Sequence, residues 1–432
     1  MNIFYGAYTL ITSLLFLFCF PPFWFYTRIS GRYRKKLKER LGDISPGLTQ
    51  ALSGSPRIWI HAVSLGEIKV AESIINALRK MIPGCSIILS TTTEHGRDLA
   101  TDTFDNRIPV IYAPVDFIAA VRKALNQIHP DVLVFLETEI WPLWIAEARR
   151  MGFKTVLVNG RISLRSFKWY HKFRPFFRHV LSNMDAFSMI MEEDRLRILT
   201  IGADPYKISV NGNAKYDLLT DLVDPSIEEE MRNTLNLEAS CPVFIAGSTR
   251  NGEESMVINA YQKILKEFPD TILLIAPRHI ERAMGIASLL KKHDLSYQLR
   301  SEIAGDREKR TEQVVIINSF GELFKLYSVS TIAFCGASLV PLGGQNPLEP
   351  AVWGKAVLYG PFMEDFLDAK ALLDDNNAGI MVSNSEMLAE NVIRLLKDPD
   401  LLKSYGNRAR EAVQKNRKAA ERHAQVIAEL VH

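Results

Sequence analysis

Charge is missing from the start of this 432-residue chain, where no charged side chain precedes Arg28. An apolar segment covers residues 3–26 and ends in four consecutive aromatic residues, 23–26. A helix of this length can cross a bilayer, and aromatic side chains are typical of the membrane interface. Pro21 and Pro22 interrupt the segment, so a buried core helix or a re-entrant segment is the alternative.

Acids are scarce in the next stretch, which is dominated by Arg28, Arg32, Arg34, Lys35, Lys36, Lys38 and Arg40. An excess of positive charge after a span predicts that the rest of the chain lies on the cytoplasmic side. A cleaved signal peptide would have its positive charges first and a small-residue cleavage site, and neither is visible. We therefore predict a single-pass membrane anchor over residues 1–27.

Cysteine is also rare. Cys19, Cys85, Cys241 and Cys335 are widely separated, no pair has metal-ligand spacing, and the nine histidines form no HxxxH cluster. A cytoplasmic location argues against disulfides, so we predict neither disulfides nor a metal site. The net charge of +3 is too small to indicate a nucleic-acid partner. The length predicts two domains, each with its own core.

Two series of short apolar runs, separated by helical patterns, predict buried parallel strands with helices on both faces. The first series comprises 57–62, 86–91, 110–112, 132–136, 155–159 and 186–191. The second comprises 243–246, 271–276, 314–318, 331–334 and 356–359. Residues 218–240 carry several acids and break the pattern, which indicates a linker with a helix. Ligands of such sheets bind beyond the carboxyl ends of the strands.

Carboxylates follow two strands of the first series. Glu67 opens a helix just after the strand at 57–62, where a carboxylate can act as a general base. The alternative is a helix N-terminal acid, whose pKa the helix dipole keeps low. Glu137 and Glu139 end a very apolar strand, where burial is costly unless the carboxylates are paired. Lys215, at the predicted domain junction, could reach a developing negative charge.

The segment 161–178 combines basic and aromatic residues and contains no acid. Arg161, Arg165 and Lys168 are its first basic residues. This pattern suits an anionic lipid surface or acceptor, and it also suits single-stranded nucleic acid. An amphipathic helix with a solvated basic face is the plain structural alternative. Because a membrane segment precedes it, we favour the lipid interpretation.

The segment 343–351, Gly-Gly-Gln-Asn-Pro-Leu-Glu-Pro-Ala, follows a predicted strand. Its glycines permit a sharp turn, Asn346 suits a helix N-cap, and Pro347 suits the first helical position. A strand, a glycine turn and a helix start can form an anion site, although an ordinary strand-to-helix turn is the alternative. Arg278 and the segments 246–250 and 320–322 also follow strands, and together they predict a nucleotide site.

These segments together resemble the 3-deoxy-D-manno-octulosonic acid (Kdo) transferases of Gram-negative lipopolysaccharide synthesis. The matching pieces cover nearly the whole chain in the expected order: the anchor with its basic residues, 61–67, 137–142, 159–163, 212–217, 277–279, 320–322 and 343–351. One departure is Gln345, where the family usually has His. A Gln still donates and accepts hydrogen bonds, but unlike His it does not titrate.

The resemblance implies an α/β fold of the GT-B glycosyltransferase type, with two doubly wound Rossmann-like domains that face a central cleft. We expect an anchor (1–27), an acceptor-binding domain (28–217), a linker (218–240) and a CMP-sugar-binding domain (241–432). The implied donor is CMP-Kdo, and the implied acceptor is an anionic lipid A precursor, lipid IVA, at the cell inner membrane. The resemblance also implies inversion at the anomeric carbon, no metal in the transfer step and no cofactor beyond the CMP-Kdo co-substrate.

Residue roles also follow from the resemblance. It implies that Glu67 deprotonates the acceptor hydroxyl and that Glu137 and Lys215 support the transition state. The residues implied to hold CMP are Pro277, Arg278, Phe320, Gly321, Glu322, Asn346, Pro347, Leu348 and Glu349. Two other functions stay open: another nucleotide-sugar transferase or epimerase of the same architecture, and a non-catalytic nucleotide-binding protein tethered at the membrane. The number and linkage of the Kdo residues cannot be read from the sequence.

Overall fold

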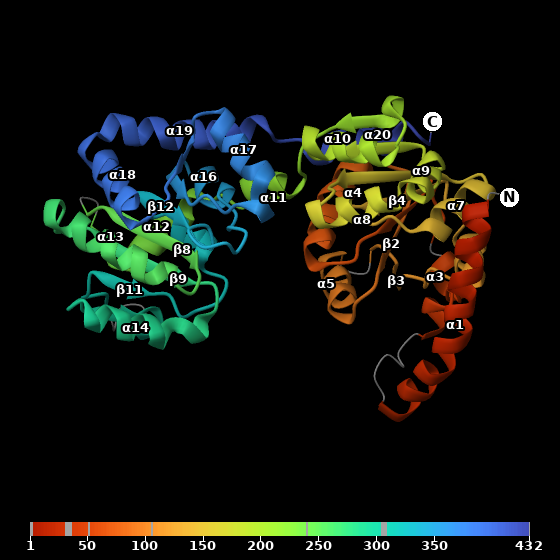
Figure 1. Cartoon of the computed structure of the whole chain (residues 1–432), viewed down its shortest axis with the longest axis horizontal. Helices are drawn as coiled ribbons and strands as arrows, with labels where there is room; N and C mark the ends of the chain where they lie inside the picture. Colours follow the sequence, from red (N-terminus) through yellow and green to blue (C-terminus); the bar gives the residue numbers. More distant parts are fainter. Residues whose placement is uncertain are drawn as a thin grey trace. The chain divides into compact units, whose positions relative to one another are not determined.

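The structure is a computed structural model that describes residues 3–30, 37–50, 52–104, 107–238, 241–303 and 309–431. The chain forms two compact units (Figure 1). Unit 1 contains Met1–Asp217 and Lys418–His432, and unit 2 contains Leu218–Arg417. Of the basic residues predicted to follow the anchor, Arg32, Arg34, Lys35 and Lys36 lie outside the described residues.

Unit 1 is built on a parallel sheet of seven strands in the order β3-β2-β1-β4-β5-β6-β7. Its strands are β1 (Arg57–His61), β2 (Ser86–Thr91), β3 (Val110–Tyr112), β4 (Val132–Leu136), β5 (Lys154–Gly160), β6 (Ala186–Met189) and β7 (Ile208–Val210). Neighbouring side chains on a strand point to opposite faces. Trp59 therefore enters one core and Ile58 and Ile60 enter the other, so both faces of the sheet are buried.

Helices cover both faces of this sheet, as a doubly wound domain requires. They are α2 (Leu37–Arg40), α3 (Pro46–Gln50), α4 (Leu65–Met81), α5 (Glu94–Phe104), α6 (Ile118–Ile128), α7 (Pro142–Arg150), α8 (Leu164–Lys172), α9 (Arg174–Ser182), α10 (Glu192–Ile201), the 3₁₀ turn η1 (Pro205–Lys207) and α20 (Ala419–Ala428). Apolar residues of α4, α5 and α20 share one core with the sheet, and those of α6, α7 and α9 share the other.

Unit 2 repeats the architecture with a second parallel sheet in the order β10-β11-β9-β8-β12-β13-β14. Its strands are β8 (Val243–Thr249), β9 (Ile272–Pro277), β10 (Tyr297–Leu299), β11 (Val314–Ile316), β12 (Ile332–Cys335), β13 (Ala356–Tyr359) and β14 (Gly379–Met381). Its helices include α12 (Pro225–Thr234), α13 (Glu253–Glu267), α14 (Ala283–Lys292), α15 (Leu323–Tyr327), α16 (Leu348–Val352), α17 (Leu367–Asp375), α18 (Ser385–Lys397) and α19 (Pro399–Lys415). α11 (Lys215–Asp221) begins in unit 1 and ends in unit 2.

The domain boundaries differ from those expected. The chain leaves unit 2 at Arg417, and α20 packs against α4 of unit 1, with Ala420, Ala424 and Ile427 in its core. Residues 418–432, expected in the second domain, therefore belong to the first, because the apolar stripe of α20 is buried there. Residues 218–238 are likewise not a separate linker, since α12 packs on α15 within unit 2.

The expected fold class is confirmed, and the expected strands are found with small shifts at their ends. Three strands were not predicted: β7, β10 and β14. Each has three residues and lies at an edge of its sheet, where the side chains are only partly buried. Edge strands of this kind lack the continuous apolar run that reveals a central strand.

The N-terminal apolar segment forms one helix, α1 (Ile3–Ser30), which runs through Pro21 and Pro22. By length and composition it is able to cross a membrane. In Figure 1 α1 (red) lies beside α7 at its N-terminal end, and the two helices are in contact. α1 is therefore part of the surface of unit 1.

Candidate active site

Glu67 lies in the first turn of α4, directly after the carboxyl end of β1. The N–H of Glu67 donates to the hydroxyl of the N-cap residue Ser64 at 3.2 Å, and the Glu67 carboxylate accepts from the N–H of Val63 at 2.8 Å. These two hydrogen bonds, one at the backbone of Glu67 and one at its side chain, hold the carboxylate in place. The side chain is 7% exposed.

The environment of Glu67 favours its protonated form. The pKa of Glu67 is raised to about 7, chiefly by burial and also by the nearby carboxylates Glu137 and Glu139, while the hydrogen bond from Val63 opposes the shift. The alternative drawn from the sequence, a helix-capping acid of low pKa, therefore does not describe this residue. Desolvation outweighs the helix dipole here because the carboxylate lies beneath the surface.

Glu137 is positioned by an unusual backbone conformation. It follows β4 with a φ of 52°, in the left-handed region that costs energy for a residue other than glycine. Its N–H donates to the carbonyl of Val158 at 3.1 Å. The ammonium nitrogen of Lys215 lies 2.6 Å from Glu137 Oε1. Strain of this kind is typical of functional sites.

Lys215 also lies beside the start of α4. A Cβ placed on Gly66 would be 3.8 Å from the Lys215 Nζ, which is ordinary van der Waals distance. The structure therefore brings Glu67, Glu137 and Lys215 together, as the resemblance implies. Gly66 has no positive φ, and a Cβ there would make only ordinary contacts, so neither the backbone nor the lysine requires a glycine at this position.

The segment that carries Lys215 is held by the last helix of the chain. The N–H of Ala214 donates to Asn159 Oδ1 at 2.9 Å. His423 of α20 contacts the Gly212 carbonyl through Nε2 at 3.0 Å and the Ser188 hydroxyl through Nδ1 at 2.6 Å. A carbonyl only accepts, so Nε2 carries the proton and Nδ1 accepts.

Burial lowers the pKa of His423 to about 4, so the imidazole is neutral at pH 7, as this pattern of one donor and one acceptor requires. The same helix fixes the segment at two more points. Asp217 Oδ2 accepts from the N–H of Ala420 at 2.7 Å, and Arg422 donates to the Asn211 carbonyl at 2.9 Å. No local sequence signal marks His423, because its partners are more than two hundred residues away.

A third carboxylate, Glu139, lies beside Trp141. It accepts from the indole N–H of Trp141 at 2.6 Å, and His61 Nε2 lies 4.0 Å from Glu139 Oε2. His61 is fully buried, and burial lowers its pKa to about 4. Its Nδ1 contacts the Ser90 hydroxyl at 3.0 Å. The Glu137–Glu139 pair in the sequence signals this residue, but the resemblance assigned it no role.

The basic and aromatic segment 161–178 forms α8 and α9 on the surface of unit 1. Arg165 and Lys168 are exposed, and so is Trp169. Arg161 lies closer to the carboxylates, because its N–H donates to the Glu137 carbonyl at 3.2 Å. The segment is thus an exposed amphipathic surface that begins beside the Glu67 site.

In unit 2 the order of the strands reverses at β8, which lies between β9 and β12. Ligands of such sheets bind at this switch point. Pro277 ends β9, and Arg278 follows with its N–H donating to the Thr249 carbonyl at 3.0 Å. In the part of the chain that the structure describes, the exposed Arg278 side chain makes no ion pair, so its donors are available to an anion.

The segment after β11 presents an aromatic ring. Phe320 is 89% exposed, and Gly321, with a φ of 84°, turns the chain behind it. Glu322 accepts from Arg300 at 2.9 Å and from the Ser319 hydroxyl. The exposed ring offers a flat face on which a nucleotide base can stack.

The glycine segment turns as expected, with φ values of 86° at Gly343 and 78° at Gly344. The helix begins one residue later than predicted. Pro347 is the N-cap of α16, and Asn346 Oδ1 accepts from the N–H of Leu348 at 3.1 Å. Because α16 has only five residues, its dipole is small and the predicted anion site at its N-terminus is weaker than expected.

Leu348 and Glu349 differ in their surroundings. Leu348 is fully buried, so its side chain is part of the core. Glu349 is partly buried in the first turn of α16. The segment before them is supported by Glu253, whose buried carboxylate accepts from the N–H groups of Ala337, Ser338 and Leu339 at 2.6 to 2.9 Å. The sequence did not predict this supporting role.

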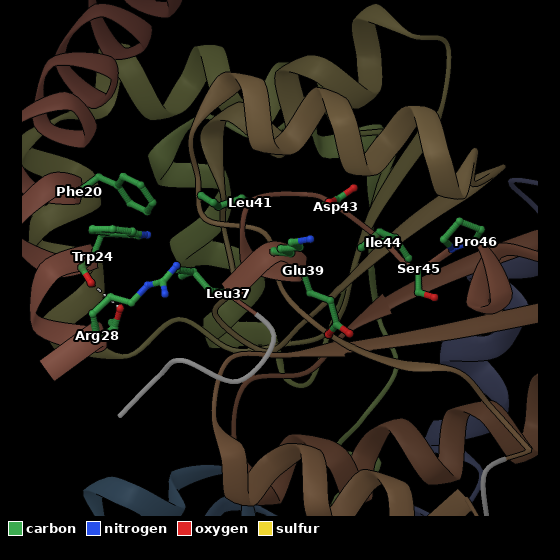
Figure 2. A pocket seen from close by; sticks show the side chains of 12 residues that line it. Phe20, Trp24, Arg28, Leu37, Glu39, Leu41, Asp43, Ile44, Ser45 and Pro46 are labelled. Atoms are coloured by element: carbon green, nitrogen blue, oxygen red, sulfur yellow. Dashed lines mark hydrogen bonds between the residues drawn. The ribbon is translucent and has the colours of Figure 1, made fainter. Parts of the chain in front are cut away.

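A cavity of about 710 Å³ lies in unit 1 beside the C-terminal end of α1. Figure 2 shows Phe20, Trp24 and Arg28 of α1 on one side of it and Leu37 and Leu41 on the other. None of the predicted site residues lines it. It is a feature of the α1 surface rather than of the carboxylate site.

The chain is similar to known glycosyltransferases. Residues 35–218 match the family described as 3-deoxy-D-manno-octulosonic-acid transferase (kdotransferase). A 3-deoxy-D-manno-octulosonic acid transferase of Haemophilus influenzae is 31% identical over 401 residues, which cover 91% of each chain. A bifunctional glycosyltransferase/methyltransferase of Fusobacterium nucleatum is 33% identical over 82% of this chain, which spans 55% of that longer relative.

Solved structures share the fold at low sequence identity. A glycosyltransferase from Rickettsia africae aligns with a TM-score of 0.61 at 16% identity, over 87% of this chain and 97% of the other. The UDP-GlcNAc 2-epimerase from Neisseria meningitidis also gives 0.61, at 15% identity, over 87% and 99%. These likenesses place both units in the GT-B type of architecture.

Proposed function

Because this chain belongs to the 3-deoxy-D-manno-octulosonic acid transferase family, we propose that it transfers Kdo from CMP-Kdo to an anionic lipid A precursor, lipid IVA, in lipopolysaccharide synthesis. The observation that carries the proposal is the buried carboxylate of Glu67, with its pKa of about 7, beside the Lys215–Glu137 ion pair. Deprotonation of an acceptor hydroxyl favours a base whose pKa lies near the working pH, and the raised pKa of this carboxylate supports that role.

In the proposed reaction an acceptor hydroxyl oxygen attacks the anomeric carbon of Kdo while the bond from that carbon to the cytidylate oxygen breaks. Attack opposite the leaving group inverts the anomeric centre. Glu67 takes the hydroxyl proton, and CMP departs with the electron pair. A base whose pKa lies near the working pH is ionised in a large fraction of the molecules, about half when the two are equal, and is still basic enough for this transfer.

Lys215 and Glu137 act together in this proposal. The ammonium group stabilises negative charge that develops in the transition state, and Glu137 fixes its position through the 2.6 Å contact. Charged groups held in advance stabilise a transition state without reorganisation. The hydrogen bonds between α20 and residues 211–217 keep the ammonium group of Lys215 in place.

Unit 2 is proposed to hold the cytidylate. Arg278 offers a planar fork of donors to the phosphate, and Phe320 offers a ring for the base. Gly321, Glu322 and the backbone of residues 346–349 complete the site by family resemblance, together with Pro277. Glu322 already pairs with Arg300, so it would bind hydroxyl groups with the lone pairs that remain.

The proposal includes no metal ion in the transfer step and no cofactor. CMP is a good leaving group, and basic side chains such as Arg278 can stabilise its phosphate. Excess EDTA should then leave the turnover of defined substrates unchanged. A loss of turnover that one divalent cation restores would contradict this part of the proposal.

The proposed lipid acceptor accounts for the basic residues on the surface of unit 1. Arg161, Arg165 and Lys168 are proposed to bind the phosphates of the lipid, since guanidinium and ammonium groups pair with phosphate. We propose that the protein is attached to the cell inner membrane with both units on the cytoplasmic side. This location suits an acceptor that is itself held in a membrane.

The direct test is an assay with purified full-length protein, CMP-Kdo labelled in the sugar, and a tetraacylated lipid A precursor in mixed micelles. Label should move to the lipid, and mass spectrometry should show a gain of whole Kdo units. A folded protein that binds CMP but transfers nothing would favour the non-catalytic alternative. Tighter binding of UDP than of CMP would favour another nucleotide-sugar enzyme.

A further inference from the structure

Arg250 directly follows the carboxyl end of β8, at the switch point of the sheet in unit 2. The Thr249 carbonyl beside it accepts from the N–H of Arg278 at 3.0 Å, so the two arginines leave the ends of neighbouring strands. Just before them, Ser248 is 7% exposed with a φ of 55°, and the register between β8 and β9 shifts. An irregularity of this kind re-aims the side chains that follow it and is typical of functional sites.

The guanidinium group of Arg250 is held at one end only. Its Nη1 donates to His279 Nε2 at 2.6 Å. Because an arginine only donates, the imidazole accepts at Nε2, carries its proton on Nδ1 and is neutral in this contact. Arg250 Nε is buried and has no partner among the residues that the structure describes. A buried donor without an acceptor is costly, so this edge of the guanidinium group favours a ligand that accepts there.

The carboxylates nearest in sequence to Arg250 already have partners. Glu253 accepts from the backbone N–H of Arg250 at 2.9 Å and from the N–H groups of residues 337–339. These four donors occupy both of its oxygens. Glu254 pairs with Arg282, whose Nε lies 3.0 Å from Glu254 Oε1. Across the described residues the Arg250 side chain makes no ion pair, so its positive charge lacks a counter-charge.

The two arginines correspond to the two acidic groups of the proposed donor. CMP-Kdo carries a phosphate, and the acid group of its sugar is a carboxylate on the anomeric carbon. Only that carbon and one oxygen separate the carboxyl carbon from the phosphorus. Two anions this close suit cations at the ends of neighbouring strands, which lie about 4.8 Å apart. Arg278 is proposed above to bind the phosphate, which leaves the carboxylate for Arg250.

We propose that the Nε and Nη2 edge of Arg250 binds the carboxylate of the Kdo unit, with His279 as the residue that positions the guanidinium group. This inference rests on the proposed function. Two parallel N–H groups of an arginine match the two oxygens of a carboxylate. A donor with a neutral sugar would leave this buried edge without an acceptor, so Arg250 selects nucleotide-activated keto acids over neutral nucleotide sugars.

The test compares three ligands in the absence of acceptor: CMP, CMP-Kdo, and the analogue in which the Kdo carboxylate is a carboxamide. Calorimetric titration gives their affinities for purified full-length wild type and Arg250→Gln. Arg394→Gln makes the same change on the exposed face of α18 and is the matched control. Circular dichroism verifies that each variant is folded.

We expect the wild type to bind CMP-Kdo more tightly than the carboxamide by a factor on the order of 10–100, because charge-assisted hydrogen bonds are lost with the carboxylate. Arg250→Gln should weaken CMP-Kdo binding by a similar factor and leave CMP binding unchanged. The variant should no longer distinguish the acid from the carboxamide. In the transfer assay Arg250→Gln should raise KM for CMP-Kdo much more than it lowers kcat.

Three outcomes would overturn the inference. Equal weakening of CMP and CMP-Kdo in Arg250→Gln would place the guanidinium group on the nucleotide. Equal weakening of CMP-Kdo and its carboxamide would place it on another part of the sugar. Equal affinity of the wild type for the acid and the carboxamide would show that no cation reads the carboxylate, whichever variants fold.

His279 is tested by rescue. His279→Ala should weaken CMP-Kdo binding but not CMP binding, and His279→Gln should restore it, because the amide oxygen accepts from Arg250 as the imidazole does. Equal losses in both variants would contradict the positioning role. The proposed function is judged separately: a wild type that binds CMP and transfers Kdo supports it even if Arg250→Gln binds CMP-Kdo normally, whereas a wild type that does not bind CMP overturns both.

Discussion

Lys215 Nζ lies 2.6 Å from Glu137 Oε1, and this contact joins the end of a central strand to the start of the helix where the chain leaves unit 1. Glu137 adopts a left-handed backbone to make it. Glu67 lies near enough that the Glu137 charge helps to raise its pKa. The three side chains therefore form one electrostatic unit, in which a change to one alters the others.

Replacing Glu67 by Gln removes the proposed base and keeps the shape of the side chain. Turnover with CMP-Kdo and lipid IVA should fall by a factor on the order of 10²–10⁴, while far-UV circular dichroism stays unchanged. Glu72→Gln on the same helix is the matched control and should retain full activity. A folded Glu67→Gln protein with near-normal turnover removes this residue from the role of base.

The pH profile of kcat/KM should follow the ionisation of Glu67. The carboxyl group accepts a proton only when ionised, and its pKa is raised to about 7. The rate should therefore rise with pH up to about 7 and level off above it. Because the Glu139 charge contributes to the raised pKa, Glu139→Gln should shift this rise to lower pH. An unchanged profile in Glu139→Gln would contradict the electrostatic coupling.

Lys215 and Glu137 should behave as a pair in a double-mutant cycle. Lys215→Met and Glu137→Gln should each lower turnover, the former by a factor on the order of 10²–10³ if it stabilises charge in the transition state. The double variant should lose much less than the product of the two losses, since each single change already breaks the contact. Independent, multiplicative losses would show that the contact has no catalytic role.

We expect His423, on the C-terminal helix α20, to help hold Lys215 in position. His423→Asn removes buried hydrogen bonds to Gly212 and Ser188, which should lower the free energy of unfolding by about 1–3 kcal/mol at pH 7.5. Turnover should fall as well, because the Lys215 segment loses its support. Arg394→Ala, on the exposed face of α18, is a control that should change neither quantity.

The stability effect should depend on pH with a defined sign. The pKa of His423 is lowered from 6.5 to about 4 in the folded protein. A lowered pKa contributes stability that is fully present above pH 6.5 and is lost as the pH falls towards 4. The difference between wild type and His423→Asn in urea unfolding should therefore shrink between pH 6.5 and pH 4. A constant difference would contradict the neutral, buried imidazole.

Nucleotide binding should depend on Arg278 and Phe320. Arg278→Ala should weaken CMP binding by a factor on the order of 10–100, because it removes charge-assisted hydrogen bonds of about 1.5–3 kcal/mol. Phe320→Ala should weaken binding of cytidine as well, whereas Arg278→Ala should leave cytidine binding unchanged. Calorimetric titration measures the affinity of each variant for CMP and for cytidine. If both variants bind the two ligands as tightly as the wild type does, the nucleotide binds elsewhere.

The sequence by itself determined the architecture of the two units, because central parallel strands are buried on both faces and appear as continuous apolar runs. It also predicted which loops carry the candidate site residues, since Glu67, Glu137 and Arg278 each lie soon after a strand. Family resemblance then supplied roles that composition could not. The short edge strands β7, β10 and β14 escaped prediction because most of their side chains are only partly buried and they contain no continuous apolar run.

Only the tertiary structure decided the pKa of Glu67, since burial and two neighbouring carboxylates act through space and oppose the local helix dipole. The tertiary structure also shows that α20 belongs to unit 1. There His423 hydrogen-bonds to Gly212, which lies more than two hundred residues earlier in the chain. The position of α1 likewise depends on Tyr8 and Tyr5, which donate to Asp116 in the loop before α6 and to the buried Glu147 of α7. Such contacts depend on where folded elements meet, and no periodicity along the chain encodes them.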